Sequence, residues 1–221
     1  MDVYPFSHFP PVYNDPAKAG MVVPLIREHI NHALFRTDSD FDWLYPEYLQ
    51  LMSQKHWTPL PIAKKAAEFL AEPGSRVLDI GSGIGKFCLT GAYFNPEADF
   101  FGVEQRHELY YHANIARNYT QLNNVGFIHA NITQINFNEF DHFYFFNAFY
   151  ENVDQKNAID DTIETSYSLY VYYTAYLLAV LKGVKKGTRL VTYQCLDEVC
   201  DINFRLVWSS DSTLLRMWIK E

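Results

Sequence analysis

Three glycines at alternate positions, placed directly after a short apolar run, constrain the fold of this chain most strongly. The run, residues 77–78, ends on Asp79, and Gly81, Gly83 and Gly85 follow it. A short apolar run of this kind is typical of a buried parallel strand. Glycines directly after a strand let the backbone turn sharply and approach a ligand closely. The pattern therefore predicts a strand, a ligand-binding loop and a helix whose first N–H groups face the ligand.

Two phosphate-binding motifs share this arrangement, and the spacing disfavours both. A dinucleotide-binding motif requires glycine or alanine three residues after its second glycine, where this chain has Lys86. A Walker-type loop requires Ser or Thr after Gly-Lys, and a glycine five residues before its last glycine. The chain has Phe87 and Ile80 at these two positions. A tight turn that binds no ligand is the remaining alternative.

The composition predicts one folded α/β domain and does not favour nucleic acid as a partner. The chain has 221 residues, of which 48% are hydrophobic and 17% aromatic, which is enough for a sizeable core. Its formal net charge is −8, so a generally basic surface for nucleic acid is absent. The first residues lack the pattern of a secretory signal, and the apolar stretch 170–181 is too short to span a bilayer. We expect a cytoplasmic protein without a membrane segment.

The cysteines and histidines indicate neither a disulfide framework nor a metal site. Cys88, Cys195 and Cys200 make an odd count, which free thiols in a reducing compartment explain most simply. The eight histidines are scattered and are not joined to cysteine or carboxylate ligand patterns. We therefore expect no metal among the site residues.

Apolar periodicity along the chain predicts strands that alternate with helices or helix-length connections. Such alternation implies a parallel sheet wrapped by helices. The last two strands alternate apolar and polar residues around a serine-rich turn, which predicts a C-terminal antiparallel hairpin. Strands are expected at residues 77–79, 99–105, 126–131, 142–150, 188–194, 203–208 and 214–219, and helices at residues 61–70, 86–94, 107–122 and 154–181.

The first 56 residues divide into an arm and a helical cap. Residues 1–20 are rich in proline, tyrosine and phenylalanine and are expected to form an arm on the surface. Helical segments are expected at residues 24–35 and shortly after them. Because these segments precede the first strand, we expect them to cover the end of the sheet that holds the ligand. The predicted division is residues 1–56, the arm and cap, and residues 57–221, the main domain.

The pattern Asp-x-Gly-x-Gly-x-Gly at residues 79–85 resembles the first motif of the class I, seven-strand S-adenosylmethionine-dependent methyltransferases. The resemblance covers residues 57–221 and implies their fold, a Rossmann-like, doubly wound α/β sheet. Its seven strands would be mostly parallel, with a C-terminal antiparallel hairpin and an N-terminal helical cap. The resemblance also implies S-adenosyl-L-methionine as the cofactor. Because this molecule carries no phosphate, the loop would approach a sulfonium amino acid and a ribose.

The resemblance places the cofactor along the carboxyl ends of the first three strands. Glu104 lies 25 residues after Asp79, near the spacing at which an acidic residue meets a ribose. Asn131 and Ile132 stand where the family places a polar residue and an apolar neighbour at the adenine. Thr58 is similar to threonines that touch the methionine end. The alternatives are a solvated acid, a turn asparagine and a plain helix cap at Thr58. The expected cofactor-binding residues are Thr58, Asp79, Gly81, Ser82, Gly83, Gly85, Glu104, Gln105, Asn131, Ile132 and Asn147.

A second motif ends the fourth predicted strand, Asn147-Ala148-Phe149-Tyr150. It resembles the Asn/Asp-Pro-Pro-Tyr/Phe tetrapeptide of methyltransferases that modify nitrogen, with both prolines replaced. In those enzymes the asparagine and the next backbone carbonyl accept hydrogen bonds from the target N–H group, and the aromatic residue packs on the substrate. The resemblance implies that Asn147 and Tyr150 are catalytic and orient the nitrogen toward the methyl group. The alternative is a core strand with a helix-capping asparagine.

Motif by motif, the chain is most similar to the non-SET histone lysine methyltransferases and their bacterial relatives. It shares with them the glycine loop and the strand segment Gly102-Val103-Glu104. We expect methyl transfer to a nitrogen of a protein (lysine-like) or of a small molecule. One alternative is a nucleic-acid N-methyltransferase, which the acidic balance does not support. The other is a protein that binds S-adenosylmethionine without transferring its methyl group.

Overall fold

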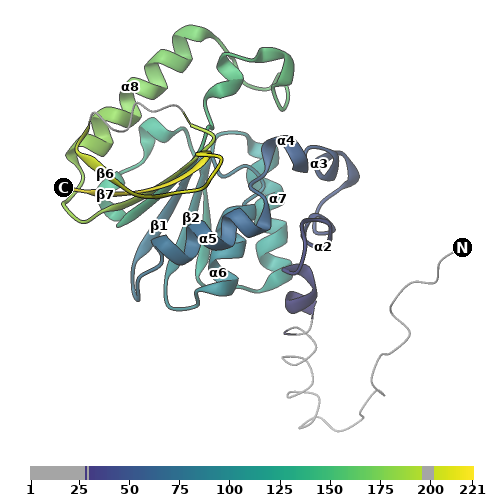
Figure 1. Ribbon diagram of the computed structural model, residues 1–221. Coiled ribbons are helices and arrows are strands. Elements are labelled where there is room, and N and C mark those ends of the chain that lie inside the picture. The colour runs from purple at the N-terminus through teal and green to yellow at the C-terminus, as the bar shows by residue number, and fades with distance from the viewer. Residues whose placement is uncertain (1–27, 29, 196–201) are drawn as a thin grey trace, which may run out of the picture.

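A seven-stranded sheet forms the centre of the molecule (Figure 1). The computed structural model describes residues 28, 30–195 and 202–221. The strand order is β3-β2-β1-β4-β5-β7-β6; β1 to β5 pair in parallel, whereas β7 is antiparallel to both β5 and β6. The predicted fold class is confirmed. The strands are β1 (Arg76–Ile80), β2 (Asp99–Glu104), β3 (Val125–His129), β4 (His142–Phe146), β5 (Arg189–Tyr193), β6 (Phe204–Ser209) and β7 (Leu215–Lys220).

The order of the strands reverses next to β1. From β1 the chain continues outward through β2 and β3, and then returns to place β4 on the other side of β1. In open α/β sheets the crevice at such a reversal, beyond the carboxyl ends of the strands, is the usual place for a ligand. The glycine loop leaves β1 at this point.

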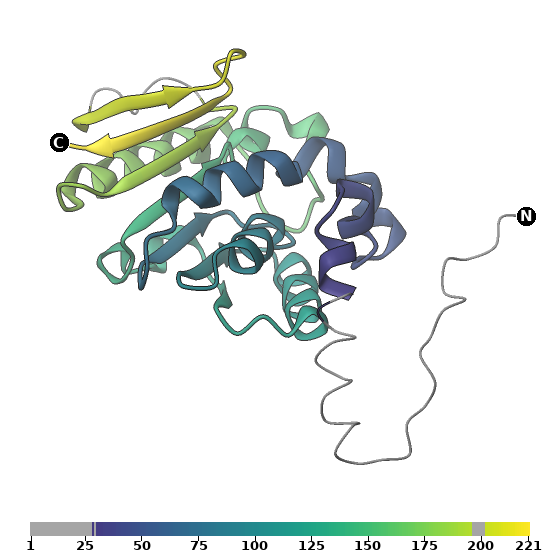
Figure 2. The same cartoon turned by 60° about the horizontal axis from the view of Figure 1, so that its bottom comes forward.

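Helices cover both faces of the sheet. Adjacent side chains of a strand point to opposite faces, so an apolar strand such as β1 needs a packing partner on each face. Val77 packs into the core beneath α5 and α6, while Leu78 and Ile80 pack into the core beneath α8. Figure 2 shows α8 on the other side of the sheet from α5. The helices are α2 (Asp38–Asp42), α3 (Glu47–Leu51), α4 (Ser53–His56), α5 (Leu60–Leu70), α6 (Lys86–Phe94), α7 (His107–Thr120) and α8 (Tyr167–Gly183); the 3-10 turns are η1 (Ile132–Gln134), η2 (Phe137–Glu139), η3 (Tyr150–Asn152) and η4 (Gln155–Asn157).

The prediction of one long helix at residues 154–181 is wrong for the first half of that range. The α-helix begins only after Ser166, whose side chain caps it by accepting a hydrogen bond from the N–H of Leu169 at 3.2 Å. Before this cap, the Asp160 carboxylate accepts from the N–H and hydroxyl of Thr162. Such local side-chain bonds compete with helix formation. The fourth strand is also shorter than predicted and ends at Phe146.

The predicted N-terminal cap is described at residue 28 and from residue 30 onward. Three short helices, α2 to α4, replace the single helical piece expected there. The predicted helix at residues 24–35 is described only in part, and the arm at residues 1–20 lies outside the described residues, as does Cys200. Within the described part of the chain, no helix has the length and apolar character that crossing a membrane requires.

Thr58 does not cap α5, contrary to one of the alternatives raised by the sequence. Helix α5 begins at Leu60, whose N–H donates to the carboxylate of Asp38 at 2.8 Å. The hydroxyl of Thr58 is instead hydrogen-bonded to the buried hydroxyl of Tyr144 at 3.0 Å. Asp38, a residue of the N-terminal cap, therefore accepts the hydrogen bond at the start of α5 that the helix-cap alternative gave to Thr58.

Candidate active site

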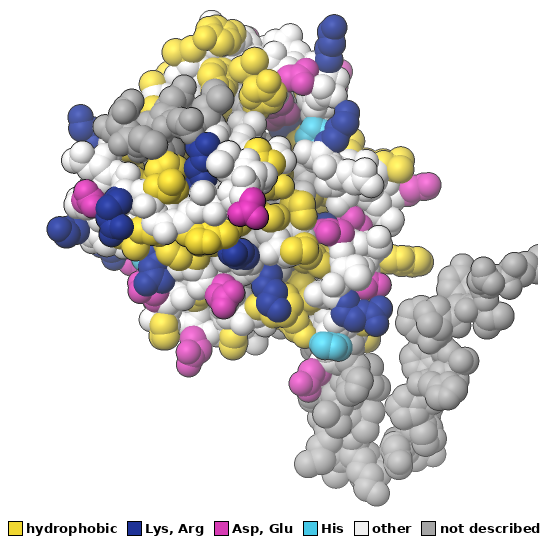
Figure 3. Space-filling view, in the orientation of Figure 1, with side chains coloured by type: hydrophobic (Ala, Val, Ile, Leu, Met, Phe, Trp, Pro, Cys, Tyr) yellow, Lys and Arg dark blue, Asp and Glu magenta, His cyan; other side chains and the backbone are white. Residues whose placement is uncertain are grey.

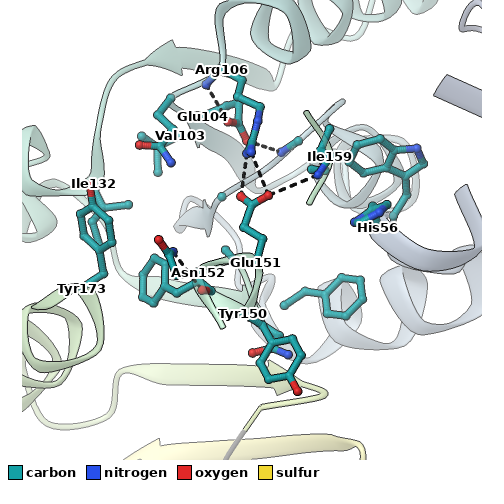
Figure 4. A pocket seen from close by; sticks show the side chains of 18 of the residues that line it. His56, Val103, Glu104, Arg106, Ile132, Tyr150, Glu151, Asn152, Ile159 and Tyr173 are labelled. Atoms are coloured by element: carbon teal, nitrogen blue, oxygen red, sulfur yellow. Dashed lines mark hydrogen bonds and ion pairs between the residues drawn. The ribbon is translucent and has the colours of Figure 1, made fainter. Parts of the chain in front are cut away.

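A cavity of about 380 Å³ opens at the carboxyl ends of β1, β2 and β4 (Figure 4). This volume is within the usual range for a small-molecule site. Lys55 and His56 of the N-terminal cap, with Trp57 directly after them, form one wall of the cavity. The predicted site residues that line the cavity are Gly81, Gly83, Glu104, Gln105, Asn131, Ile132, Asn147 and Tyr150.

The three loop glycines have left-handed backbone conformations, but they serve different contacts. A Cβ atom on Gly83 would lie 2.7 Å from the ring of Trp57, the residue directly after the cap. A Cβ atom on Gly85 would lie 2.3 Å from the ring of Phe127, on β3. Gly85 does not line the cavity; its glycine allows α6 to pack closely on the sheet. Gly81 and Gly83 therefore form the cavity floor, and Gly85 supports the loop from below.

Thr58, Asp79 and Ser82 lie together on a second, smaller cavity of about 30 Å³. The two cavities share Trp57 and Gly81, so they adjoin at the glycine loop. The hydroxyl oxygen of Ser82 is buried without a hydrogen-bond partner among the described residues. A buried polar atom of this kind is costly unless a ligand or water completes it. Three of the residues predicted to bind the cofactor are therefore grouped at one place.

Two carboxylates lie beneath the loop, and burial raises the pKa of each. Glu104 is 6% exposed and accepts the N–H groups of Gly83 at 2.9 Å and of Arg106 at 2.8 Å. These two bonds favour its charged form and partly oppose the effect of burial. Asp79 is 4% exposed, and its carboxylate accepts from the thiol of Cys88 at 3.7 Å. The loop and the β2 end are thus joined through Glu104.

Arg106 is a site residue that sequence reasoning missed. Its guanidinium makes a bidentate pair with Glu151, at 2.7 and 2.8 Å, and its Nε donates to Asp160 at 2.9 Å. Arg106 follows β2, whereas both acids follow β4, so the pair joins the two sides of the cavity (Figure 4). Arg106 is 4% exposed, and planar bidentate pairing is the arrangement that a guanidinium suits best. The signal available in the sequence was a basic residue placed two positions after Glu104, the acid that ends β2.

The side chain of Asn131 makes four hydrogen bonds. Its Oδ1 accepts from the N–H of Thr133 at 3.1 Å and from the hydroxyl of Thr133 at 3.0 Å. Its Nδ2 donates to Oε1 of Gln105 at 3.0 Å and to the hydroxyl oxygen of Tyr173 at 2.8 Å. Tyr173 comes from α8, lines the cavity and lies beside Ile132 (Figure 4).

Asn147 is the first residue after β4 and has a left-handed backbone, with φ of 41°. Asparagine tolerates this conformation better than most residues. Its N–H donates to the sulfur of Cys195 at 3.3 Å, and its side chain lines the cavity without a hydrogen bond to another described residue. Phe149 is buried against Phe145 and Tyr173, whereas Tyr150 is 44% exposed.

A model of the methyltransferase domain family matches residues 71–210. The chain belongs to this methyltransferase domain family. Membership confirms S-adenosylmethionine as the expected cofactor of this methyltransferase. The matched region lies inside the range 57–221 predicted for the main domain. The more specific resemblance to the non-SET histone lysine methyltransferases is not confirmed by these comparisons.

Two curated relatives are tRNA (guanine-N(7)-)-methyltransferases from Synechococcus sp. strains JA-3-3Ab and JA-2-3B'a(2-13). The methyltransferase is 34% identical to the first over 126 residues and 34% identical to the second over 107 residues. These alignments cover 57% and 48% of this chain, and 45% and 37% of the relatives. The chain therefore spans less than half the length of the curated relatives it matches.

Solved structures are similar in fold. A SAM-dependent O-methyltransferase from Thermotoga maritima superposes with a TM-score of 0.50 at 16% identity, over 79% of this chain and 71% of that one. An RNA methyltransferase from Salinibacter ruber in complex with S-adenosyl-L-homocysteine superposes with a TM-score of 0.47 at 16% identity, over 74% of this chain and 91% of that one. At these identities the likeness concerns the fold alone.

Proposed function

We propose that this methyltransferase transfers the methyl group of S-adenosylmethionine to a nitrogen atom of an acceptor held beside Asn147. One observation carries the proposal. The side chain of Asn147 lines the same cavity as the glycine loop and Glu104, and it makes no hydrogen bond to another described residue. The amide oxygen of an asparagine at the end of β4 can accept a hydrogen bond from the N–H group of the molecule to be methylated. This bond fixes the direction of the nitrogen lone pair.

The residues present fit the cofactor. The unpartnered hydroxyl of Ser82 and the floor formed by Gly81 suit the methionine end. The carboxylate of Glu104 has acceptor capacity beyond its two backbone N–H donors and suits the ribose hydroxyls. When bound, S-adenosylmethionine supplies a methyl group that is electrophilic because it is attached to a positively charged sulfur. The chain supplies proximity, orientation and exclusion of water.

The favoured acceptor is an amine of a protein, such as a lysine, or of a small molecule. Phe149 and Tyr150 give the acceptor side of the cavity an aromatic wall, and an apolar surrounding favours the neutral, nucleophilic form of an amine. The face in Figure 3 carries Lys and Arg side chains interspersed with Asp and Glu, without one basic patch. Together with the net charge of −8, this supports an acceptor other than nucleic acid.

A nucleic acid is the second candidate acceptor, because both curated relatives are named for methylation of guanine N7 in tRNA. The two candidates make different demands on Asn147. An amine carries an N–H group that can donate a hydrogen bond to the amide oxygen of Asn147, whereas guanine N7 carries no proton. Loss of the Asn147 side chain should therefore slow amine methylation strongly and affect N7 methylation less.

Transfer of a radiolabelled methyl group into a whole-cell extract tests the proposal. Label in protein or in small amines supports it, and label in RNA supports the second candidate. Binding of S-adenosylhomocysteine with no labelled product from any fraction would support the non-catalytic alternative.

Two variants separate the role of the Asn147 side chain from that of its backbone. Asn147→Ala removes the amide but retains a Cβ atom in the left-handed conformation, whereas Asn147→Gly also relieves any strain. We expect both variants to lose turnover and to retain affinity for S-adenosylhomocysteine. Unchanged turnover in both variants would remove Asn147 from the catalytic role.

A further inference from the structure

The hydrogen bonds of Asn131 leave its side chain no free group for a nucleobase. A primary amide has two N–H donors and one carbonyl oxygen with two lone pairs. The oxygen accepts from the backbone N–H and the hydroxyl of Thr133, and the two N–H groups donate to Gln105 and Tyr173. All four positions are occupied. The role expected from the sequence, a polar side chain of Asn131 at the adenine, would require one of these bonds to break if the amide contacted the ring directly.

The orientation of the amide is fixed by the backbone. A backbone N–H can only donate, so the atom that faces the N–H of Thr133 must be the oxygen of Asn131. The nitrogen of Asn131 then faces Tyr173, and the hydroxyl oxygen of Tyr173 must accept the bond between them. The phenolic proton of Tyr173 is therefore directed elsewhere, and no other described residue accepts it.

The position of this unused donor matches one end of the cavity. Tyr173 is half-buried and lines the cavity together with Ile132 and Val103. Ile132 is 7% exposed and Val103 1% exposed, so buried apolar side chains line the cavity together with Tyr173 (Figure 4). An apolar slot with one convergent polar group is the usual arrangement for binding a flat ring. An adenine ring offers nitrogen acceptors such as N3 and N7.

We propose that Tyr173 of α8 recognises the cofactor by donating its phenolic proton to a ring nitrogen of the adenine. Asn131 is then a positioning residue, which holds the oxygen of Tyr173 and thereby directs its proton. Gln105 is oriented in the same way as Tyr173: its Oε1 accepts a hydrogen bond from Asn131, so its amide N–H groups remain donors. The site therefore recognises the acceptor nitrogens of the ring rather than its amino group. This inference rests on S-adenosylmethionine as the cofactor.

Calorimetric titration with S-adenosylhomocysteine is the first test. Tyr173→Phe removes only the hydroxyl and is expected to weaken binding about tenfold, the order of one net hydrogen bond. Tyr172→Phe is the matched control, because Tyr172 is the next residue of α8, is 55% exposed and does not line the cavity. We expect the affinity of this control to equal that of the wild type. Equal affinity of Tyr173→Phe and the wild type would overturn the inference.

Analogues of the ligand separate a direct contact from a structural effect. The 1-deaza, 3-deaza and 7-deaza forms of S-adenosylhomocysteine each replace one ring nitrogen by C–H. One of them should bind the wild type about tenfold more weakly than S-adenosylhomocysteine, yet bind Tyr173→Phe no more weakly than S-adenosylhomocysteine does. Losses that simply add for all three analogues would overturn the inference, even if Tyr173→Phe alone weakens binding.

The role of Asn131 is tested by Asn131→Asp. An aspartate keeps the oxygen that accepts from Thr133 but places a second oxygen opposite Tyr173, where it accepts the phenolic proton. We expect an affinity loss similar to that of Tyr173→Phe, and no further loss when the two changes are combined. Additive losses would contradict the positioning role. Failure of the wild type to bind S-adenosylhomocysteine would overturn the proposed function as well, whereas binding that does not depend on Tyr173 would overturn this inference alone.

Discussion

A Cβ atom on Gly81 would lie 2.4 Å from the Cβ atom of Ala148. The glycine loop after β1 and the segment after β4 are therefore in direct contact, and Ala148 is the neighbour of Asn147. Contacts this short do not occur between real Cβ atoms, so a side chain at position 81 must displace one of the two segments. The absence of a side chain at Gly81 sets the distance between the glycine loop and the segment after β4.

Gly81→Ala is expected to displace Asn147 as well as destabilise the fold. The left-handed backbone, with φ of +78°, costs about 1–2 kcal/mol for alanine, and the clash adds about 1–3 kcal/mol. Gly74→Ala is the matched control, because Gly74 has φ of +75° and nothing within 4 Å of its Cβ position. Chemical denaturation should give the larger loss for Gly81→Ala, together with loss of methyl transfer. Equal losses would show that the contact with Ala148 is unimportant.

The affinity for the cofactor should fall as the pH is lowered toward the raised pKa of Glu104. The carboxylate is the form that accepts from ribose hydroxyls, and a raised pKa means that it is protonated above the usual range for glutamate. Titrations with S-adenosylhomocysteine between pH 8 and pH 5 should show this decline in the wild type. Glu104→Gln should bind more weakly at pH 8 and show a flatter profile. A decline of equal steepness in Glu104→Gln would assign it to another group.

The stability of the unliganded protein should respond to Glu104 in the opposite direction. The folded state binds the proton of this carboxyl more tightly than the unfolded state does, so protonation favours folding at low pH. This contribution is lost as the pH rises through the raised pKa. The melting temperature of the wild type relative to Glu104→Gln should therefore decrease as the pH is raised. A difference that increases with pH would contradict the sign of the shift.

Removal of the guanidinium of Arg106 should separate the two sides of the cavity. Arg106→Gln leaves Glu151, whose side chain is 12% exposed, without its partner, and breaking a buried pair costs about 3–5 kcal/mol. Arg205→Gln is the control, because Arg205 and Glu221 are about 60% exposed and such pairs contribute about 1 kcal/mol or less. In Arg106→Gln, we expect the KM for the acceptor to rise more than the Kd of S-adenosylhomocysteine. Equal changes in both constants would argue against a specific effect on the acceptor side.

The N-terminal cap should loosen when the ammonium of Lys86 is removed. This group is 2% exposed and lies 2.7 Å from Asp38 and 2.9 Å from Asp42. Lys86→Met preserves the volume but leaves two acids unpaired, at a cost of about 3 kcal/mol. Hydrogen exchange should accelerate across residues 38–57 before it changes in β1. Lys185→Met, which affects an exposed pair with Asp141, should leave the exchange of the cap unchanged.

The strands and the glycine loop were predictable because their signals are local. Apolar runs give the parallel strands, and alternate glycines after a strand-end acid give the loop. The predicted fold class and cofactor are accordingly confirmed. The ends of elements were less predictable where a distant side chain decides them. Asp38 takes the acceptor role at the start of α5, and Ser166 sets the start of α8.

The contacts across the cavity were not predictable from one sequence. Arg106 pairs with residues 45 and 54 positions away, and Asn131 meets Tyr173 at a separation of 42 positions. No local pattern relates such partners, because the order of the strands brings them together. The motif at residues 131–132 lines the cavity, but the hydrogen bonds of Asn131 depend on Tyr173, a residue of a helix far away in the sequence.

The reversal of strand order beside β1 has a consequence for how this protein can change. On the proposed assignment, the carboxyl ends of β1 to β3 hold the cofactor, and the segments after β4 hold the acceptor. The residues that hold the two ligands thus lie in two consecutive stretches of the chain, which meet at Gly81 and Ala148. A new acceptor could be accommodated by altering the later stretch alone, while the earlier one continued to bind the same methyl donor.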